Sequence, residues 1–142
     1  MIDSAGGVSV GAALAQARAN VEALRGRALA VVETQIGALE AVPRPVGLDD
    51  TPARLDQAYR AATELIDAAG PFELHDLCRA AGGLCDLIGA ADPGEAFDWR
   101  IVLVHARSLR LLHTLPAEAV GERARILQSL GEVIERKLAQ TG

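Results

Sequence analysis

The chain has 142 residues, of which 50% are apolar but only 3% aromatic, and it carries a formal net charge of −5. A core built from Ala, Leu, Val and Ile suits helices better than sheets. The acidic balance and the scarcity of aromatic side chains for base stacking argue against nucleic-acid binding. No apolar run approaches the roughly 20 residues that a membrane helix needs, and "MIDSAGGVSVG" lacks the pattern of a signal peptide. We therefore expect one cytoplasmic, all-α domain that binds neither nucleic acid nor membrane.

A long amphipathic helix is expected over residues 9–42, after a flexible segment at residues 1–8. Ser9 suits the N-cap and Pro43 stops the helix. Small and apolar residues fill two heptad positions for about four heptads, interrupted by one glutamine; the two sets are Leu14, Val21, Ala28, Gln35, Val42 and Val10, Ala17, Leu24, Val31, Ala38. At about 1.5 Å per residue the helix outreaches a compact bundle. Part of it should project into solvent or meet another chain, as in a homodimer, unless it packs on its own bundle.

Four shorter helices should follow a linker at residues 43–52, which is rich in proline and glycine. Asp50 or Thr51 can cap the first of them, with Pro52 in the first turn, and Gly70 and Pro71 end it. The remaining helices are expected over about residues 73–89, from Asp92 to about 113, and over about residues 117–138. The sequence predicts an antiparallel helical bundle at residues 53–142, packed with the first helix as a single domain.

Cys78 and Cys85 are the only cysteines, and their spacing places them on one face of one predicted helix. Two thiols about 10 Å apart on a rigid helix cannot form a disulfide with each other. Packed thiols in a reducing compartment are the expected state, rather than a metal or redox site.

The stretch that begins at His75 echoes the motif of histidine phosphotransfer (Hpt) domains, H-x-L-K-G-x-x-x-x-L-G. Cys78 replaces the lysine of that motif and Arg79 its first glycine. In Hpt domains the chain turns about ten residues after the histidine, which would be at Cys85. The sequence "GGLCDLIG" there contains no proline and stays apolar on one face. The alignment that starts at His75 therefore fails.

An alignment that starts twelve residues earlier, at Thr63, places the turn at "AGPFE", where proline and glycine require one. Thr63 then stands at the phosphoacceptor position, Ile66 at the lysine and Asp67 at the first glycine. Transfer from an aspartyl phosphate requires an imidazole nitrogen, which can form and release a phosphoramidate. A threonine hydroxyl is far more basic when deprotonated and has no base placed beside it. Ile66 removes the cation that neutralises a phosphoryl group, and Asp67 adds a negative charge. The pattern predicts an Hpt-like fold without phosphotransfer.

The stretches "LDQAYRAATELIDAAGPFELHDLCRAAGGLCDLI", "WRIVLVHARSLRLL" and "GGVSVGAALAQARANVEALR" resemble the CheE-type proteins of alphaproteobacterial chemotaxis operons. The resemblance covers most of the chain and rests on an apolar pattern and small motifs. It implies a cytoplasmic accessory protein of chemotaxis or two-component signalling. The implied partners are a response-regulator receiver domain or a chemotaxis histidine kinase, and the family has no established catalytic residue to transfer.

The other charged and titratable residues favour binding over catalysis. His75 is expected at the surface, His105 at the edge of the core, and His113 in the last turn of its helix. The histidines lack metal-ligand spacing, and we expect neither a metal nor a cofactor. Arg100, Arg107 and Arg110 share roughly one stripe of the fourth predicted helix, which is either a solvated face or a surface for an acidic receiver pocket.

Three hypotheses follow from the sequence. The first is a non-catalytic Hpt-like adaptor that binds a receiver or kinase, through Thr63, Ile66, Asp67 and the three arginines. The second is an active phosphotransfer protein whose phosphoacceptor is His75 or His105. The third is a structural helical protein that self-associates through the first helix.

Overall fold

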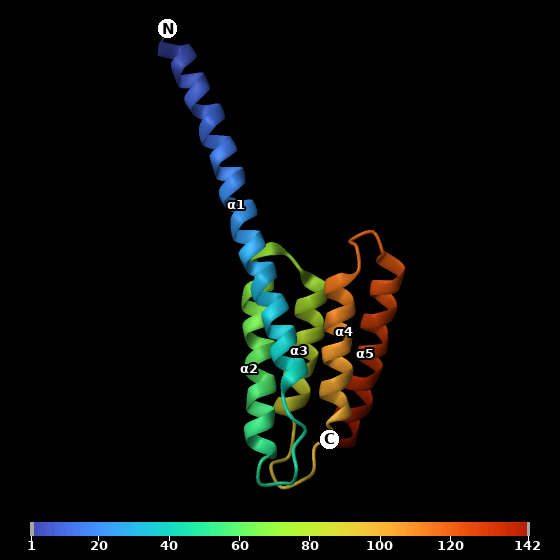
Figure 1. Cartoon of the computed structure of the whole chain (residues 1–142). Coiled ribbons are helices and arrows are strands. Elements are labelled where there is room, and N and C mark those ends of the chain that lie inside the picture. The colour runs from blue at the N-terminus through green and yellow to red at the C-terminus, as the bar shows by residue number, and fades with distance from the viewer. Residues whose placement is uncertain (1, 142) are drawn as a thin grey trace.

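The computed structural model describes the backbone of residues 2–141 and the side chains of residues 9–139, and all regular structure in that part is helical. The elements in Figure 1 are α1 (Ile2–Ala41), α2 (Thr51–Ala69), the 3₁₀ turn η1 (Gly70–Phe72), α3 (His75–Gly89), α4 (Arg100–Thr114) and α5 (Val120–Thr141). The predicted all-α class is confirmed. Within the described residues, none of these helices is long and apolar enough to cross a membrane.

The helices pack in a defined order around one core. α1 and α3 each contact both α2 and α4, and α5 packs against α3 and α4. The C-terminal half of α1 is thus part of the bundle, which contains five helices in the described residues rather than the four of a four-helix bundle. The core is aliphatic, as the composition predicts, with one buried aromatic side chain, Trp99, among the described residues. Alanines on the buried face of α2 allow its neighbours to approach closely.

Only the C-terminal part of α1 is buried. Ala28, Val32, Ile36 and Leu39 face the core, whereas residues 9–24 are exposed along their whole length. Figure 1 shows this N-terminal part of α1 extending beyond the end of the bundle. We call residues 9–27 the projecting segment. The N-terminal part of α1 thus projects from the bundle and the C-terminal part packs on it, whereas a homodimer through this helix stays a prediction.

The face that α1 presents to the bundle differs from the predicted heptad seam. The bundle buries Val32, Ile36 and Leu39, while Val31 and Ala38 of the seam are exposed. A straight α-helix has about 3.6 residues per turn, so a seam with a period of 3.5 rotates by about 20° per heptad around the helix. By residue 31 the seam has therefore turned away from the core.

Several predicted helix starts are corrected by local hydrogen bonds. α1 begins at Ile2 rather than at Ser9; the flexibility of residues 1–8 stays a prediction, because their side chains and Met1 lie outside the described part of the chain. α4 begins at Arg100 instead of following Asp92, whose carboxylate accepts the Gly94 N–H at 2.9 Å and closes a local turn. The Asp98 carboxylate accepts the Arg100 N–H at 3.1 Å where the helix actually starts.

The two ends of α2 match the sequence, although one capping role is different. α2 begins at Thr51 with Pro52 in its first turn. Asp50 occupies the N-cap position but makes no capping bond; its carboxylate accepts the Val46 and Gly47 N–H groups of the preceding loop. At the other end α2 stops at Ala69, and η1 follows.

The chain turns between α2 and α3, as "AGPFE" predicts. After η1, Glu73 adopts the left-handed conformation with φ 58°, and the Leu74 N–H donates to the Ala69 carbonyl at 3.3 Å. α3 then begins at His75. The helix is therefore broken at Gly70, where the alignment that starts at Thr63 expects a turn; the correspondence with the Hpt motif itself stays a prediction.

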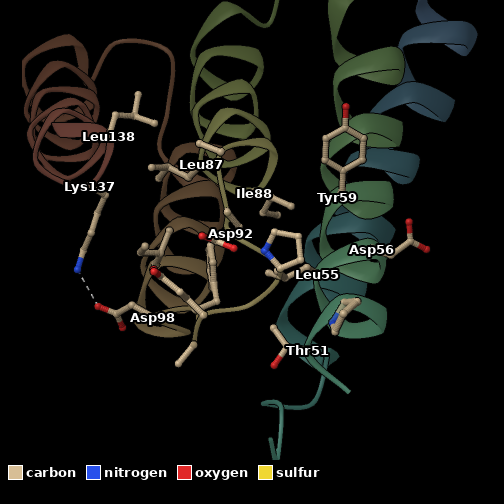
Figure 2. A pocket seen from close by; sticks show the side chains of 18 residues that line it. Thr51, Leu55, Asp56, Tyr59, Leu87, Ile88, Asp92, Asp98, Lys137 and Leu138 are labelled. Atoms are coloured by element: carbon tan, nitrogen blue, oxygen red, sulfur yellow. Dashed lines mark hydrogen bonds and ion pairs between the residues drawn. The ribbon is translucent and has the colours of Figure 1, made fainter. Parts of the chain in front are cut away.

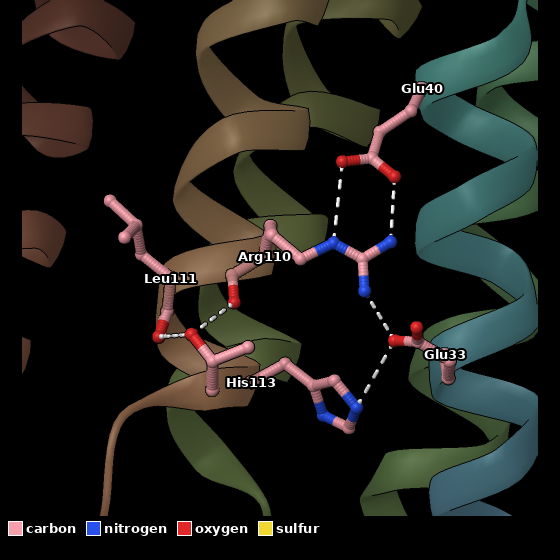
Figure 3. Close-up of polar contacts among 6 residues, drawn as sticks. Glu33, Glu40, Arg110, Leu111 and His113 are labelled. Carbon is pink, nitrogen blue, oxygen red and sulfur yellow. Dashed lines mark hydrogen bonds and ion pairs between the residues drawn. The ribbon is translucent and has the colours of Figure 1, made fainter.

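An ion-pair cluster joins α1 to α4 near the middle of the bundle (Figure 3). The Arg110 guanidinium donates through Nη2 to Glu40 Oε1 at 2.6 Å and through Nε to Glu40 Oε2 at 3.3 Å, and it also pairs with Glu33. His113 Nε2 lies 3.4 Å from Glu33 Oε2. The hydrogen bond from Arg110 holds the pKa of Glu40 below its ordinary value. We call these four residues the α1–α4 clamp.

Removing the clamp should cost a modest amount of stability. We expect Arg110→Gln to lower the free energy of unfolding by about 1 kcal/mol, because the pairs are bidentate but partly exposed to solvent. Urea denaturation followed by circular dichroism measures this difference. Arg107→Gln, on the same helix but exposed, is the control and should change little. The difference between the two variants should shrink in 1 M NaCl; equal stability at low salt would contradict the prediction.

Candidate functional site

The three predicted α2 positions lie within one helical turn, but their environments differ. Thr63 is half-buried, and its hydroxyl donates to the Tyr59 carbonyl at 2.7 Å. Ile66 packs against the core, and Asp67 is exposed. In the alignment that puts Thr63 at the phosphoacceptor position, the hydroxyl proton of that residue is already donated to a backbone carbonyl. Of these three residues, only Asp67 presents an exposed charge to a partner.

The two cysteines pack from α3 toward α2 and are free thiols. Cys85 Sγ lies 4.0 Å from Thr63 Oγ1, and Cys78 Sγ lies 4.0 Å from the Ile66 carbonyl oxygen. Burial raises the pKa of both thiols. Raised pKa values keep the groups protonated near neutral pH, and this is the state of a packing cysteine rather than of a nucleophile.

His75 is exposed at the first position of α3, as the sequence predicts. It lines a shallow hollow of about 450 Å³ where α1 leaves the bundle, together with Arg25, Asp76, His113 and Arg123. Arg123 is committed elsewhere: it donates to the Leu115 carbonyl at 2.6 Å and pairs with Asp76 at 3.3 Å. The two arginines that line this hollow are therefore Arg123, which is bound to a carboxylate, and Arg25 of α1.

His105 is fully buried, deeper than the core edge that the sequence suggested. Its Nδ1–H donates to the Ile101 carbonyl at 2.7 Å, so Nε2 carries the lone pair. Within the described residues Nε2 has no hydrogen-bond partner, and it faces Gly83 and the Ile134 side chain. Burial lowers the pKa of His105. A fully buried imidazole whose pKa is lowered stays neutral near neutral pH, and this is the usual state of a histidine that packs in a core.

The three predicted arginines of α4 lie in different environments, and two of them form ion pairs with acidic residues of the chain. Arg110 is held in the α1–α4 clamp. Arg100 donates Nε to Asp98 Oδ1 and Nη2 to Asp98 Oδ2, both at 2.9 Å, and Lys137 Nζ lies 3.0 Å from the same carboxylate. Hydrogen bonds, the one from Arg100 foremost, hold the pKa of Asp98 well below its usual range. Arg107 is exposed and forms no ion pair within the described residues.

Exposed apolar side chains accompany Arg107 on the same side of α4. Leu103, Val104 and Leu111 are 49%, 42% and 45% exposed. With Arg100 they follow helical spacing around Arg107; we call this surface the α4 face, formed by Arg100, Leu103, Val104, Arg107 and Leu111. The charge pattern predicted only the arginines of this face, although the sequence also contains a signal for its apolar part. The run "IVLV" cannot be buried on all sides of one surface helix, so two of its four residues must face outward.

The candidates on α2 and those on α4 do not form one surface. α1 and α3 each contact both helices, so α2 and α4 lie across the bundle from each other. A partner that covers Asp67 on α2 would therefore approach from a different side than one that covers Arg107. The sequence alone could not reveal this separation.

A cleft of about 510 Å³ opens near the end of the bundle where α2 begins (Figure 2). Its walls are mostly apolar and come from α2, α3, the loop before α4, α4 and α5, with Leu55, Tyr59, Ile88 and Phe97 among them. Carboxylates and one ion pair, Asp98–Lys137, lie at its edge. No histidine or cysteine lines it.

Comparison with known proteins adds no assignment. No protein-family model, no curated protein and no solved structure matches this chain. In the described part of the chain, no group of three or more His, Cys, Asp or Glu side chains could hold a metal ion.

The buried imidazole of His105 should make the fold sensitive to pH. Burial lowers the pKa of His105 in the folded chain, whereas in the unfolded chain the imidazole has its ordinary pKa of about 6.5. Below that pH the unfolded chain therefore binds a proton at His105 more readily than the folded chain does. Stability should therefore fall as the pH is lowered through that value, by about 1 kcal/mol between pH 7.5 and 5.5. Urea denaturation at both pH values measures this loss.

His105→Leu should abolish most of the difference between the two pH values, whatever it does to stability at pH 7.5. His75→Ala is the matched control, since that ring is exposed, and it should retain the wild-type difference. An unchanged pH dependence in the His105 variant would contradict the assignment.

Proposed function

We propose that this protein is a non-catalytic, Hpt-like helical adaptor of chemotaxis or two-component signalling that binds a receiver domain through the α4 face. The observation that carries the binding surface is Arg107, an exposed cation without an ion pair in the described chain, set among exposed apolar side chains. An acidic receiver pocket is the complementary surface, because it offers carboxylates to the guanidinium and apolar rims to the leucines.

The state of the candidate phosphoacceptors supports a role without catalysis. The Thr63 hydroxyl donates to a backbone carbonyl, and His105 has no exposed surface. His75 is exposed, but Asp76 beside it and Glu73 two residues earlier place carboxylates where a phosphoryl group would approach. The resemblance to CheE-type proteins agrees with this proposal. In it, an Hpt-like module that lacks the phosphoacceptor histidine binds a receiver as a competitor or sink.

The docking surface is tested by reversing one charge. We expect Arg107→Glu to weaken binding to a receiver domain from the same cell, held in its phosphorylated-like form with beryllofluoride, by at least tenfold. A tenfold loss corresponds to about 1.4 kcal/mol, which is modest for a charged pair at an interface. Isothermal titration calorimetry against each receiver and kinase domain of that cell identifies the partner and measures the loss.

Two controls separate the α4 face from other surfaces. Arg125→Glu makes the same charge change at an exposed position of α5 and should leave binding within threefold. Asp67→Lys changes the exposed charge on α2, on the other side of the bundle, and should also have little effect. Loss of binding in the Asp67 variant, with normal binding in the Arg107 variant, would place the docking surface on α2 and overturn the proposed site.

Phosphotransfer is tested directly with a radiolabelled receiver. We expect no acid-labile label on the protein after incubation with a phosphorylated receiver domain, and unchanged receiver binding by His75→Ala. Label that appears on the wild-type chain and disappears in the His75 variant would replace the adaptor with a working relay.

A further inference from the structure

The projecting segment carries an apolar stripe that the rest of the described chain does not cover. Its large apolar side chains are between 50% and 61% exposed: Val10, Leu14, Val21 and Leu24. Every residue from 9 to 24 is exposed, and Ala28 is the first buried residue of α1 among the described side chains. At about 1.5 Å per residue, the 19 residues of the segment extend for about 28 Å.

The stripe has the geometry of a coiled-coil seam. Val10, Leu14, Ala17, Val21 and Leu24 follow one another at alternating spacings of four and three residues. This spacing is the a/d repeat that packs knobs into holes against one other helix. The seam leads directly to Ala28, an a position that the bundle buries at 9% exposure. The exposed stripe therefore meets the buried face of α1 at Ala28, before the seam turns away from the core at Val31.

Three of the six e and g positions that flank the seam are basic, and none is acidic. Arg18 and Arg25 occupy e positions, Arg27 a g position, and the single acid of the segment, Glu22, lies at a b position away from the seam. The segment thus has a net charge of +2, from three arginines and one glutamate, in a chain whose total charge is −5. In coiled coils the e and g charges select the partner.

We propose that the projecting segment binds an acidic amphipathic helix of another protein, forming a short coiled coil at the end of the bundle. Glutamates at the e and g positions of that helix would pair with Arg18, Arg25 and Arg27, while its apolar residues cover the seam. This surface is separate from the α4 face and does not depend on receiver binding.

The charges make a second copy of the chain a poorer occupant. Self-pairing would place six arginines beside the seam, with no acidic e or g residue in the segment to offset them. The small Ala17 further limits the apolar contact that could overcome this repulsion. An acidic helix removes the repulsion and adds ion pairs.

The shape of the stripe also argues against an anionic membrane. Helices that lie in a membrane interface present a broad apolar face with aromatic side chains and a strongly charged opposite face. Here the stripe is the narrow a/d seam, and residues 9–27 contain no aromatic residue. The b, c and f positions on the opposite face carry one charged residue, Glu22, and half of them are alanine: Ala12, Ala15, Ala19 and Ala23.

Binding of designed helical peptides to the full-length protein tests the proposal. Three peptides of three heptads share valine at a and leucine at d and differ only at e and g, which are glutamate, glutamine or lysine. Fluorescence anisotropy of the labelled peptides should show that the glutamate peptide binds at least tenfold more tightly than the lysine peptide. Arg18→Glu combined with Arg27→Glu should reverse this preference.

Substitutions on the two sides of the segment separate the seam from the general charge. Leu24→Asp should weaken the glutamate peptide by at least tenfold. Ala19→Asp introduces the same side chain at an exposed position about 180° around the helix from Ala28, and should leave binding within threefold. Arg107→Glu should have no effect, so failure of this proposal and failure of the α4 face are distinguishable.

Three results would overturn the proposal. The first is absence of glutamate-peptide binding at 100 μM, or equal binding of all three peptides. The second is a concentration-dependent dimer in sedimentation equilibrium that Leu24→Asp abolishes, because it would make a second copy the occupant. The third is binding of the wild-type protein, but not of the Leu24 variant, to phosphatidylglycerol vesicles without any preference among the peptides.

Discussion

The structure depends on a mismatch of length: one straight helix is much longer than the bundle against which it packs. α1 has 40 residues, whereas α3 and α4 have 15 each. At about 1.5 Å per residue these lengths are about 60 Å and 22 Å, so a single pass along the bundle can bury only part of α1. The buried part is fixed by Val32, Ile36 and Leu39, and the remainder must leave the bundle as an uninterrupted extension. An apolar stripe on that extension is exposed because the fold has no further helix to cover it.

The turn between α2 and α3 bears on which residue the Hpt alignment would place at the phosphoacceptor position. The break after Ala69 agrees with the alignment that starts at Thr63, and the Thr63 hydroxyl donates to the Tyr59 carbonyl within α2 itself. The imidazole that is best protected from water, His105, is neutral and enclosed by α3 and α5. The imidazole that is exposed, His75, lies at a helix end among carboxylates and arginines. Burial and accessibility are therefore divided between two histidines, and neither combines a shielded site with access for a partner.

Much of the helical architecture could be predicted, because proline, glycine and apolar periodicity act locally. The ends of α2 and the turn at "AGPFE" are examples. The errors arose where a side chain has two possible local partners: Asp92 closes a turn with Gly94 instead of capping a helix, and Asp50 binds the preceding loop. The surfaces were harder still. Which face of α1 meets the bundle, and that α2 and α4 lie across it from each other, depend on packing between distant segments. Arg110 shows the consequence: its sequence position fits a binding stripe, but its guanidinium binds α1.

The direction of the projecting segment is set by the apolar core more than by the α1–α4 clamp. Burying an aliphatic side chain contributes about 1.5–3 kcal/mol, and Val32, Ile36 and Leu39 are each almost completely buried. The clamp is partly exposed and contributes about 1 kcal/mol, so its loss leaves most of the packing of α1 in place. Its main effect is on the alignment of the two helices, because the bidentate contact of the Arg110 guanidinium fixes the position of α4 along α1. The clamp and the core join α1 to α4, so the seam and the α4 face belong to one rigid framework. Two partners bound at once would therefore keep a fixed position relative to each other.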